Sequence, residues 1–173
     1  NFATLNPLDP ASGQTLSEGN LKTVIPDNKT SIATMFVPSG KWYWEVKTNN
    51  PGGVGIINSL AAHAGRGANN NNGSGGYYNF STFHGTIYYD SSTDTTPSTG
   101  TAGDIVGVAL DMDNNKIYWH VNGIYISLSG GQQNPTTAAN PIAIVQRDAP
   151  EHNFAPTIGS YSTNPAFIAN FGQ

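Results

Sequence analysis

The central stretch GDIVGVALDMDNNKIYWHVNGIYI (103–126) is the feature that most constrains the fold of this chain. Two apolar runs flank the polar patch DMDNN, and the dipeptide Asn122-Gly123 follows the second run directly. Asn-Gly is a preferred two-residue hairpin turn because both residues tolerate positive φ. The pattern therefore predicts a β-meander of three antiparallel strands at 104–111, 116–121 and 124–128.

Strand signals continue along the rest of the chain, where apolar residues alternate with polar ones or form short runs, without a long helical pattern. Segment 41–48 (KWYWEVKT) alternates in this way, and segment 105–110 (IVGVAL) is apolar on both faces, as expected of a central strand that is covered from both sides. The other expected strands are 20–25, 31–37, 41–48, 53–58, 77–82, 85–89, 141–146, 155–160 and 166–171. Many short strands joined by Gly-, Pro- and Asn-rich turns predict an all-β fold, a sandwich of two antiparallel sheets with essentially no helix.

Composition removes several classes of function. Charged residues make up 10% of the 173 residues, whereas about 25% is usual. The chain has only seven Lys and Arg and a net charge of −4, so we expect no nucleic-acid partner. No apolar run approaches the ~20 residues of a membrane helix, so no membrane association is expected. The lack of cysteine excludes disulfides, thiolate nucleophiles and zinc–thiolate sites.

Three long polar segments separate the expected strands: 59–76, 90–103, and 129–140 together with 147–154. Loops longer than about 12–15 residues are uncommon unless they are functional or disordered. We therefore expect rigid sheets that carry a polar loop surface.

Three motifs resemble the SPRY domain family: SGKWYWEV (39–46), GDIVGVALDMDNNKIYWHVNG (103–123) and ANFGQ (169–173). The resemblance covers about residues 30–173. It implies a bent two-sheet, concanavalin-like β-sandwich that is not an enzyme, needs no cofactor and meets its partners with the loops at one end.

The opening FATLNPLDPASGQTLSEGNLKTV (2–24) resembles the N-terminal strand pair of SPRY domains in tailed-bacteriophage virion proteins such as tail fibres. This resemblance and the nearly uncharged loops imply a phage protein at the virion surface. We expect residues 1–29 to form a strand pair or arm that packs on a single sandwich domain of residues 30–173. The chain opens without Met and lacks the residues that follow NFGQ in the family, so we expect a fragment of a longer protein.

Two motifs that suggest chemistry have simpler interpretations. DMDNNK (111–116) begins like a calcium-binding EF-hand loop, but Lys116 and Asn122 occupy the positions of the required Gly and Glu. We expect a turn in which Asx side chains bond their own backbone. None of the four histidines has the spacing of a metal site, so no metal is predicted, and His120 is expected on the sheet face opposite to Trp119.

Motifs that would support a catalytic site are also missing from the sequence. There is no G-x-S-x-G motif, and nothing pairs Glu45 with Glu151 as glycoside hydrolysis would require. The Gly- and Asn-rich stretch GRGANNNNGSGG lacks a phosphate-binding pattern, but its amides suit sugar hydroxyls. Tyr77-Tyr78 and Tyr88-Tyr89 are each expected to place one ring inside and one outside.

We therefore expect a non-enzymatic binding module of a phage virion, whose loops recognise a host-surface glycan or protein with little dependence on salt. The candidate binding residues, chosen by loop position and side-chain type, are Asn70, Asn71, Tyr78, His84, Tyr89, Asp94, Gln132, His152 and Asn153. One alternative is an architectural capsid-decoration or fibre-assembly domain, which contacts copies of itself or other virion proteins through edge strands and the arm NFATLNPL (1–8). A lesser alternative is the accessory domain of a carbohydrate-active enzyme.

Overall fold

The computed structural model describes residues 2–49, 52–59, 76–82, 84–89, 92–145, 153–161 and 165–173. The elements named within these ranges are all strands. They are β1 (Thr15–Ser17), β2 (Lys22–Val24), β3 (Thr30–Ile32), β4 (Lys41–Thr48), β5 (Gly52–Asn58), β6 (Tyr77–Ser81), β7 (Thr86–Tyr89), β8 (Ser92–Thr95), β9 (Ile105–Asp111), β10 (Lys116–Val121), β11 (Ile124–Tyr125), β12 (Ser127–Leu128), β13 (Gly131–Gln132), β14 (Ile142–Ala143), β15 (Phe154–Ser160) and β16 (Ala166–Asn170). In these ranges no helix has the length and hydrophobicity needed to cross a membrane.

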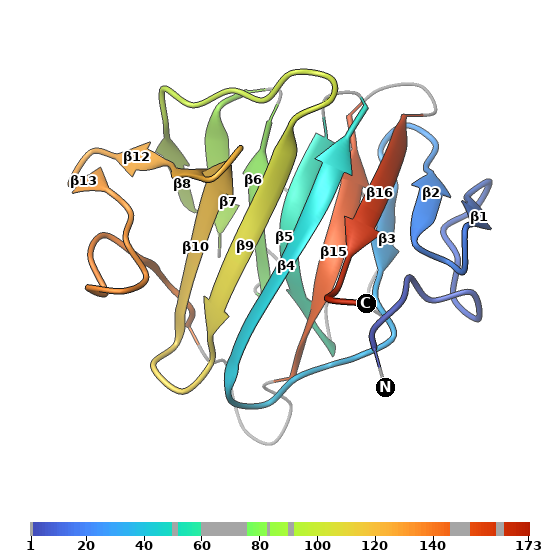
Figure 1. Cartoon of the computed structure of the whole chain (residues 1–173), viewed down its shortest axis with the longest axis horizontal. Coiled ribbons are helices and arrows are strands. Elements are labelled where there is room, and N and C mark those ends of the chain that lie inside the picture. Colours follow the sequence, from blue (N-terminus) through green and yellow to red (C-terminus); the bar gives the residue numbers. More distant parts are fainter. Residues whose placement is uncertain are drawn as a thin grey trace.

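The strands form two antiparallel sheets that lie face to face (Figure 1). One sheet has the order β1-β2-β16-β4-β9-β10-β11, with β14 also paired to β10, and the other has the order β3-β15-β5-β6-β7-β8. β12 and β13 form a separate pair. The predicted all-β sandwich is confirmed, and the pairing of β1 with β2 and of β2 with β16 extends the first sheet by the N-terminal residues.

The meander follows the predicted order. β9 pairs with β10 in register from Asp111↔Lys116 to Val106↔Val121, and β11 returns on the other side of β10. Asn122 and Gly123 both have positive φ, as the Asn-Gly turn requires. The third predicted strand is split, because Ile126 turns into the core and the chain beyond it pairs with β13 instead of β10.

The core lies between the sheets and is filled by large aromatic and aliphatic side chains, including Trp119, Phe80, Phe154 and Phe167. The Trp119 indole N–H donates to the carbonyl oxygen of Val54 at 2.8 Å and so links the two sheets. The prediction that both faces of 105–110 are covered by packed side chains is wrong for Ile105, which is exposed at the outer face.

Three strands lie outside the strand ranges that the pattern of apolar residues predicts: β1, β8 and β13. β8 (STDT) has no apolar residue, and only its pairing with β7 makes it a strand. The predicted strand 31–37 is cut to β3, because beyond Ala33, which bridges to Leu5, pairing continues only as a single bridge of Val37 with Phe154.

Candidate functional site

A cleft of about 410 Å³ opens at one edge of the sandwich, where the β7–β8 hairpin faces the segment that carries β12 and β14. Its lining residues are Tyr89, Ser92, Asp94, Leu128, Ser129, Gly130, Asn140, Pro141, Ile142, Ala143 and Val145. Figure 1 shows these elements together at the edge of the molecule remote from β1. The volume is within the range of small-ligand sites.

The β7–β8 hairpin forms one wall of the cleft with side chains on the inner face of its sheet. Tyr89 pairs with Ser92 and Ile87 pairs with Asp94, so these four side chains share one face of the sheet. Ile87 is fully buried in the core, whereas Ser92 is exposed and Tyr89 and Asp94 are half-buried. On this inner face, the apolar core therefore ends at Ile87, and Ser92 and Asp94 of β8 form a polar margin beside it.

The opposite wall is fixed by amide side chains. The Asn140 side chain donates to the carbonyl oxygen of Gln132 at 2.9 Å, and Asn140 itself has a φ of 48°. Asn134 exchanges two backbone hydrogen bonds with Ala139. The Asn134 carboxamide oxygen accepts from the backbone N–H groups of Thr136 and Thr137. These bonds brace the segment that carries Asn140, the residue of this group that lines the cleft.

The cleft combines apolar surface with a few polar groups. The polar side chains come from Tyr89, Ser92, Asp94, Ser129 and Asn140, and among the residues that the structure describes the lining has no Lys, Arg or His. A single carboxylate among hydroxyls and an amide accepts hydrogen bonds from hydroxyl and amide donors and disfavours anions. An aromatic ring beside such groups suits a sugar or a peptide.

A family model for the SPRY domain matches residues 41–170. The chain belongs to the SPRY family. SPRY domains mediate protein–protein interactions generally. No curated protein matches this SPRY domain.

Solved structures show the same fold. The SPRY domain of human HERC1 is 17% identical, with a TM-score of 0.68 and 98% of each chain covered. The stonustoxin structure is 18% identical with a TM-score of 0.67, and the match covers 98% of this chain and 27% of that chain. The TRIM65 PSpry domain is 11% identical with a TM-score of 0.65, covering 98% of this chain and 92% of that one. The fold is therefore that of a SPRY β-sandwich.

Two candidate binding residues lie together in the cleft of this SPRY domain, Tyr89 and Asp94. Gln132 lies in the wall behind it, where its side chain donates to the carbonyl oxygen of Tyr125 at 3.0 Å. His84 lies apart from the cleft, with its ring against Tyr88 and Tyr161.

The remaining candidate binding residues are not found in the cleft lining. Asn153 lies just before β15, where its carbonyl oxygen accepts from the N–H of Ser59. Asn70, Asn71 and His152 are outside the described residues.

The prediction that Tyr78 offers a surface contact is wrong, since its side chain is 0% exposed. Alternation does put Tyr77 and Tyr78 on opposite faces of β6, but both faces are buried there. The Tyr78 hydroxyl accepts from the backbone N–H of Val145 at 2.7 Å, so Tyr78 supports the cleft from below.

Sequence reasoning missed Ser92, Ser129 and Asn140 in the cleft lining. Ser92 belongs to segment 90–103, which the sequence predicts to be a polar loop. The polar stretch STDT follows TIYY closely in the sequence, and this is the pattern that could have indicated a strand at Ser92. No local signal marks Ser129 or Asn140, because only the tertiary fold brings them to β8.

A second polar cluster lies on the outer face of the eight-stranded sheet, opposite to Trp119 as predicted for His120. The Tyr43 hydroxyl is 2.6 Å from Glu45 Oε1 and 2.7 Å from His120 Nε2. The Gly123 N–H donates to His120 Nδ1 at 3.0 Å, so Nδ1 carries no proton and Nε2–H donates to Tyr43. Tyr43 in turn donates to Glu45.

The ionisation of this cluster follows from its burial. Burial lowers the pKa of His120 although the charge of Glu45 opposes the shift. Burial, together with the hydrogen bond and charge of Glu45, raises the pKa of Tyr43 well above its usual value. Tyr43 thus stays protonated near neutral pH and is a poor nucleophile.

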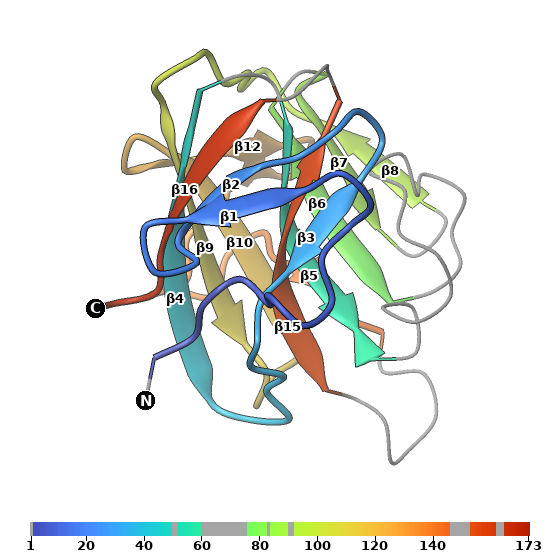
Figure 2. The ribbon, with the colours of Figure 1, turned by 90° about the vertical axis from the view of Figure 1, so that its right-hand side faces the viewer.

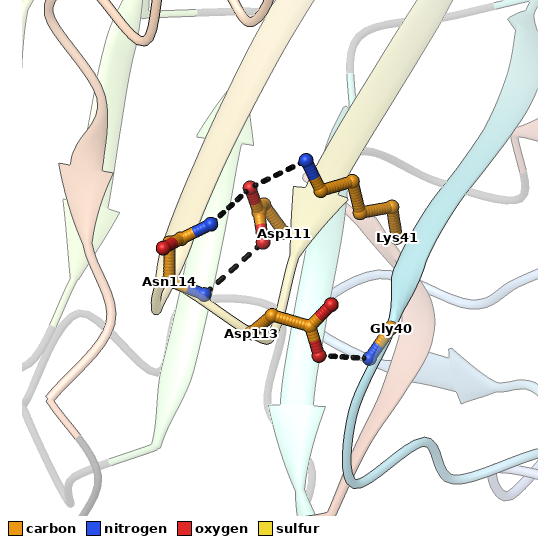
Figure 3. A network of polar contacts seen from close by, with 5 residues as sticks. All are labelled: Gly40, Lys41, Asp111, Asp113 and Asn114. Atoms are coloured by element: carbon orange, nitrogen blue, oxygen red, sulfur yellow. Dashed lines mark hydrogen bonds and ion pairs between the residues drawn. The ribbon is translucent and has the colours of Figure 1, made fainter.

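The turn between β9 and β10 is the Asx turn that the sequence predicts. Asp111 accepts hydrogen bonds from the backbone and side-chain nitrogens of Asn114 (Figure 3). Although burial raises the pKa of Asp111, the bonds from Asn114 and the charge of Lys41 lower it below its usual value. Within the described part of the chain, no group of three or more His, Asp or Glu side chains is placed to hold a metal.

Proposed function

We propose that this SPRY domain is a non-enzymatic binding module of a bacteriophage virion, which recognises a host-surface glycan or protein in the cleft between β8 and β14. The observation that carries the proposal is the preformed cleft itself. Its walls are held by the β7–β8 hairpin and by the Asn134 and Asn140 hydrogen bonds. Recognition by fixed groups needs no chemical step and little ordering on binding.

The lining chemistry supports an uncharged, hydroxyl- or amide-rich partner. Ser92, Asp94 and Ser129 accept hydrogen bonds, and the Tyr89 ring offers an apolar platform. The resemblance of residues 2–24 to phage virion proteins supports a place at the virion surface.

The test uses the soluble domain in a glycan array and in an assay of phage adsorption to its host. We expect binding to a surface sugar or protein, with inhibition of adsorption. Asp94→Ala should weaken affinity about fivefold, the loss of roughly 1 kcal/mol of hydrogen bonding. Thr93→Ala, on the same strand but the opposite face, is the matched control and should leave affinity unchanged. A domain that neither binds nor inhibits adsorption contradicts the proposal.

An architectural role is the second candidate, favoured by the exposed N-terminal arm. Phe2 is 63% exposed and Leu8 is 93% exposed. Exposed apolar side chains of this size mark contact surfaces. If this role is correct, sedimentation should show an assembly of the domain with itself or with other virion proteins that Leu8→Asp disrupts.

A further inference from the structure

Half of β4 is an open sheet edge. β4 pairs with β9 from Lys41 to Lys47, but it pairs with β16 only from Glu45 to Thr48. β16 ends at Asn170, where the Asn170 side chain accepts from the N–H of Gly172 and the chain turns away. Within the described part of the chain, the first residues of β4 therefore have no neighbouring strand on that side.

The backbone groups of Lys41 and Tyr43 point to this open side. The Thr48 N–H donates to the carbonyl of Asp104 beside β9, whereas the Asn49 N–H donates to the carbonyl of Ala166 in β16. Because the bonding direction alternates along a strand, residues 41 and 43 face the side of β16. Among the residues that the structure describes, no backbone group of either residue has a hydrogen-bond partner there.

An apolar pocket of about 300 Å³ lies directly beside this edge. Its walls are Phe2, Ala3, Met35, Val37, Trp42, Tyr43, Trp44, Leu110, Pro156 and Phe171. In Figure 2 both chain ends lie beside this part of β4. Trp44 is only 3% exposed, and its buried indole N–H has no hydrogen-bond partner among the residues that the structure describes. The pocket floor is therefore apolar apart from this one buried donor.

The open edge is held rigid at its start (Figure 3). The Gly40 N–H donates to Asp113 Oδ1 at 2.7 Å, and Lys41 Nζ lies 3.5 Å from Asp111 Oδ2. The Trp42 indole N–H donates to the carbonyl of Ser39 at 2.7 Å. The edge is thus a preformed template, which lowers the entropic cost of binding.

We propose that the open edge of β4 and the apolar pocket together bind an extended peptide segment of a partner protein, which adds to the sheet antiparallel to β4 and in line with β16. A peptide strand supplies both kinds of group that the site lacks: backbone donors and acceptors for Lys41 and Tyr43, and an apolar side chain for the pocket. Strand addition of this kind is a recurring mode of peptide recognition.

The register defines the chemistry of the peptide. The residue opposite Tyr43 exchanges two backbone hydrogen bonds with it, and the next residue lies opposite Trp42 and points its side chain into the pocket. The residue after that lies beside Lys41, whose side chain is 71% exposed, and opposite charges are favoured across strands. The site therefore selects an apolar residue followed directly by an acidic one.

The experiment selects a display library of random linear twelve-residue peptides on the whole domain and measures the affinity of selected peptides by calorimetry. We expect enrichment of an apolar–acidic doublet. Tyr43→Pro removes the N–H that points away from β9 and leaves the β4–β9 ladder intact, as proline does on edge strands. It should weaken peptide binding at least tenfold. Tyr43→Ala, which also loses the ring but keeps the N–H, is the matched control and should weaken binding by no more than about threefold.

If Tyr43→Pro does not fold, a second test reverses the charge of Lys41 on the domain and of the acidic residue on the peptide. Lys41→Glu should weaken the acidic peptide and favour the same peptide with lysine at that position. Amide hydrogen exchange adds a direct readout: the Tyr43 N–H should exchange faster than that of Trp44 in the free domain and become protected in the complex.

Several results would overturn the proposal. They are a library without enriched peptides, peptides that bind Tyr43→Pro as tightly as the parent domain, or a Lys41→Glu domain with unchanged preference. Loss of peptide binding in Asp94→Ala would place the peptide in the other cleft, and dimerisation through β4 in sedimentation would show a second copy as the occupant. Because Asp94→Ala does not touch β4, failure here and failure of the proposed cleft function are distinguishable.

Discussion

His120 has only one protonation state that satisfies its surroundings. Nδ1 accepts from the Gly123 N–H, and Nε2 donates to the Tyr43 hydroxyl, which donates to Glu45. A proton added to Nδ1 would face an N–H donor and break the bond to the Asn122-Gly123 turn. The alternation of KIYWHV predicts the face on which His120 lies, but the partner Tyr43 is 77 residues away and local sequence does not indicate it.

We predict that this histidine makes the fold acid-sensitive. Burial lowers the pKa of His120 in the folded state, so the unfolded chain binds more protons below its pKa of about 6.5. Stability is therefore complete above pH 6.5 and falls as the pH drops toward the folded pKa, by at most about 1.4 kcal/mol per pH unit. Urea unfolding of the parent and of His120→Gln at pH 7.5 and 5.5 measures this loss in the free energy of unfolding. The parent should lose more stability than the variant, and equal losses would contradict the assignment.

At the scale of the element, the β9–β10 hairpin can be predicted from its own residues, whereas β8 cannot. The sequence of β9 and β10 predicts the hairpin because the apolar runs and the Asn-Gly turn are local signals. β8 and the cleft were not predictable in this way, since STDT becomes a strand only beside β7 and its opposite wall comes from residues 128–145. Pairing over long sequence distances therefore decides the site, whereas local pattern decides the meander.

Gly107 in the middle of β9 provides a prediction at this level. Gly107 pairs with both Glu45 and His120, and a methyl group added there would collide with the imidazole ring of His120. Gly107→Ala should therefore destabilise the domain by about 1–3 kcal/mol, as overpacking typically does. Chemical unfolding measures the change. Ala109→Ser, two residues along the same face, is the control, and a Gly107→Ala domain as stable as this control would contradict the steric role.

At the scale of the whole molecule, the two sheets share one apolar core, and the Trp119 indole bonds across it to Val54. The sequence predicts the sandwich from many short strands. It does not distinguish the three tryptophans from one another. Trp119 is fully buried and hydrogen-bonded across the sheets, and Trp42 is 41% exposed. Trp44 is buried, and its N–H has no partner in the part of the chain that the structure describes.

Replacing each of the two buried tryptophans by phenylalanine separates the contribution of the Trp119–Val54 hydrogen bond from that of packing. Trp119→Phe and Trp44→Phe remove the same volume from the core, so their cavity costs are similar in kind. Trp119→Phe also leaves the Val54 carbonyl without its donor, whereas Trp44→Phe removes a donor that already has no acceptor. We expect Trp119→Phe to be the more destabilising by about 1–3 kcal/mol, the cost of one unsatisfied buried group. Urea unfolding at pH 7.5 gives the comparison. Equal losses would mean that packing alone joins the sheets, and a larger loss for Trp44→Phe would mean that its indole N–H has an acceptor in solution.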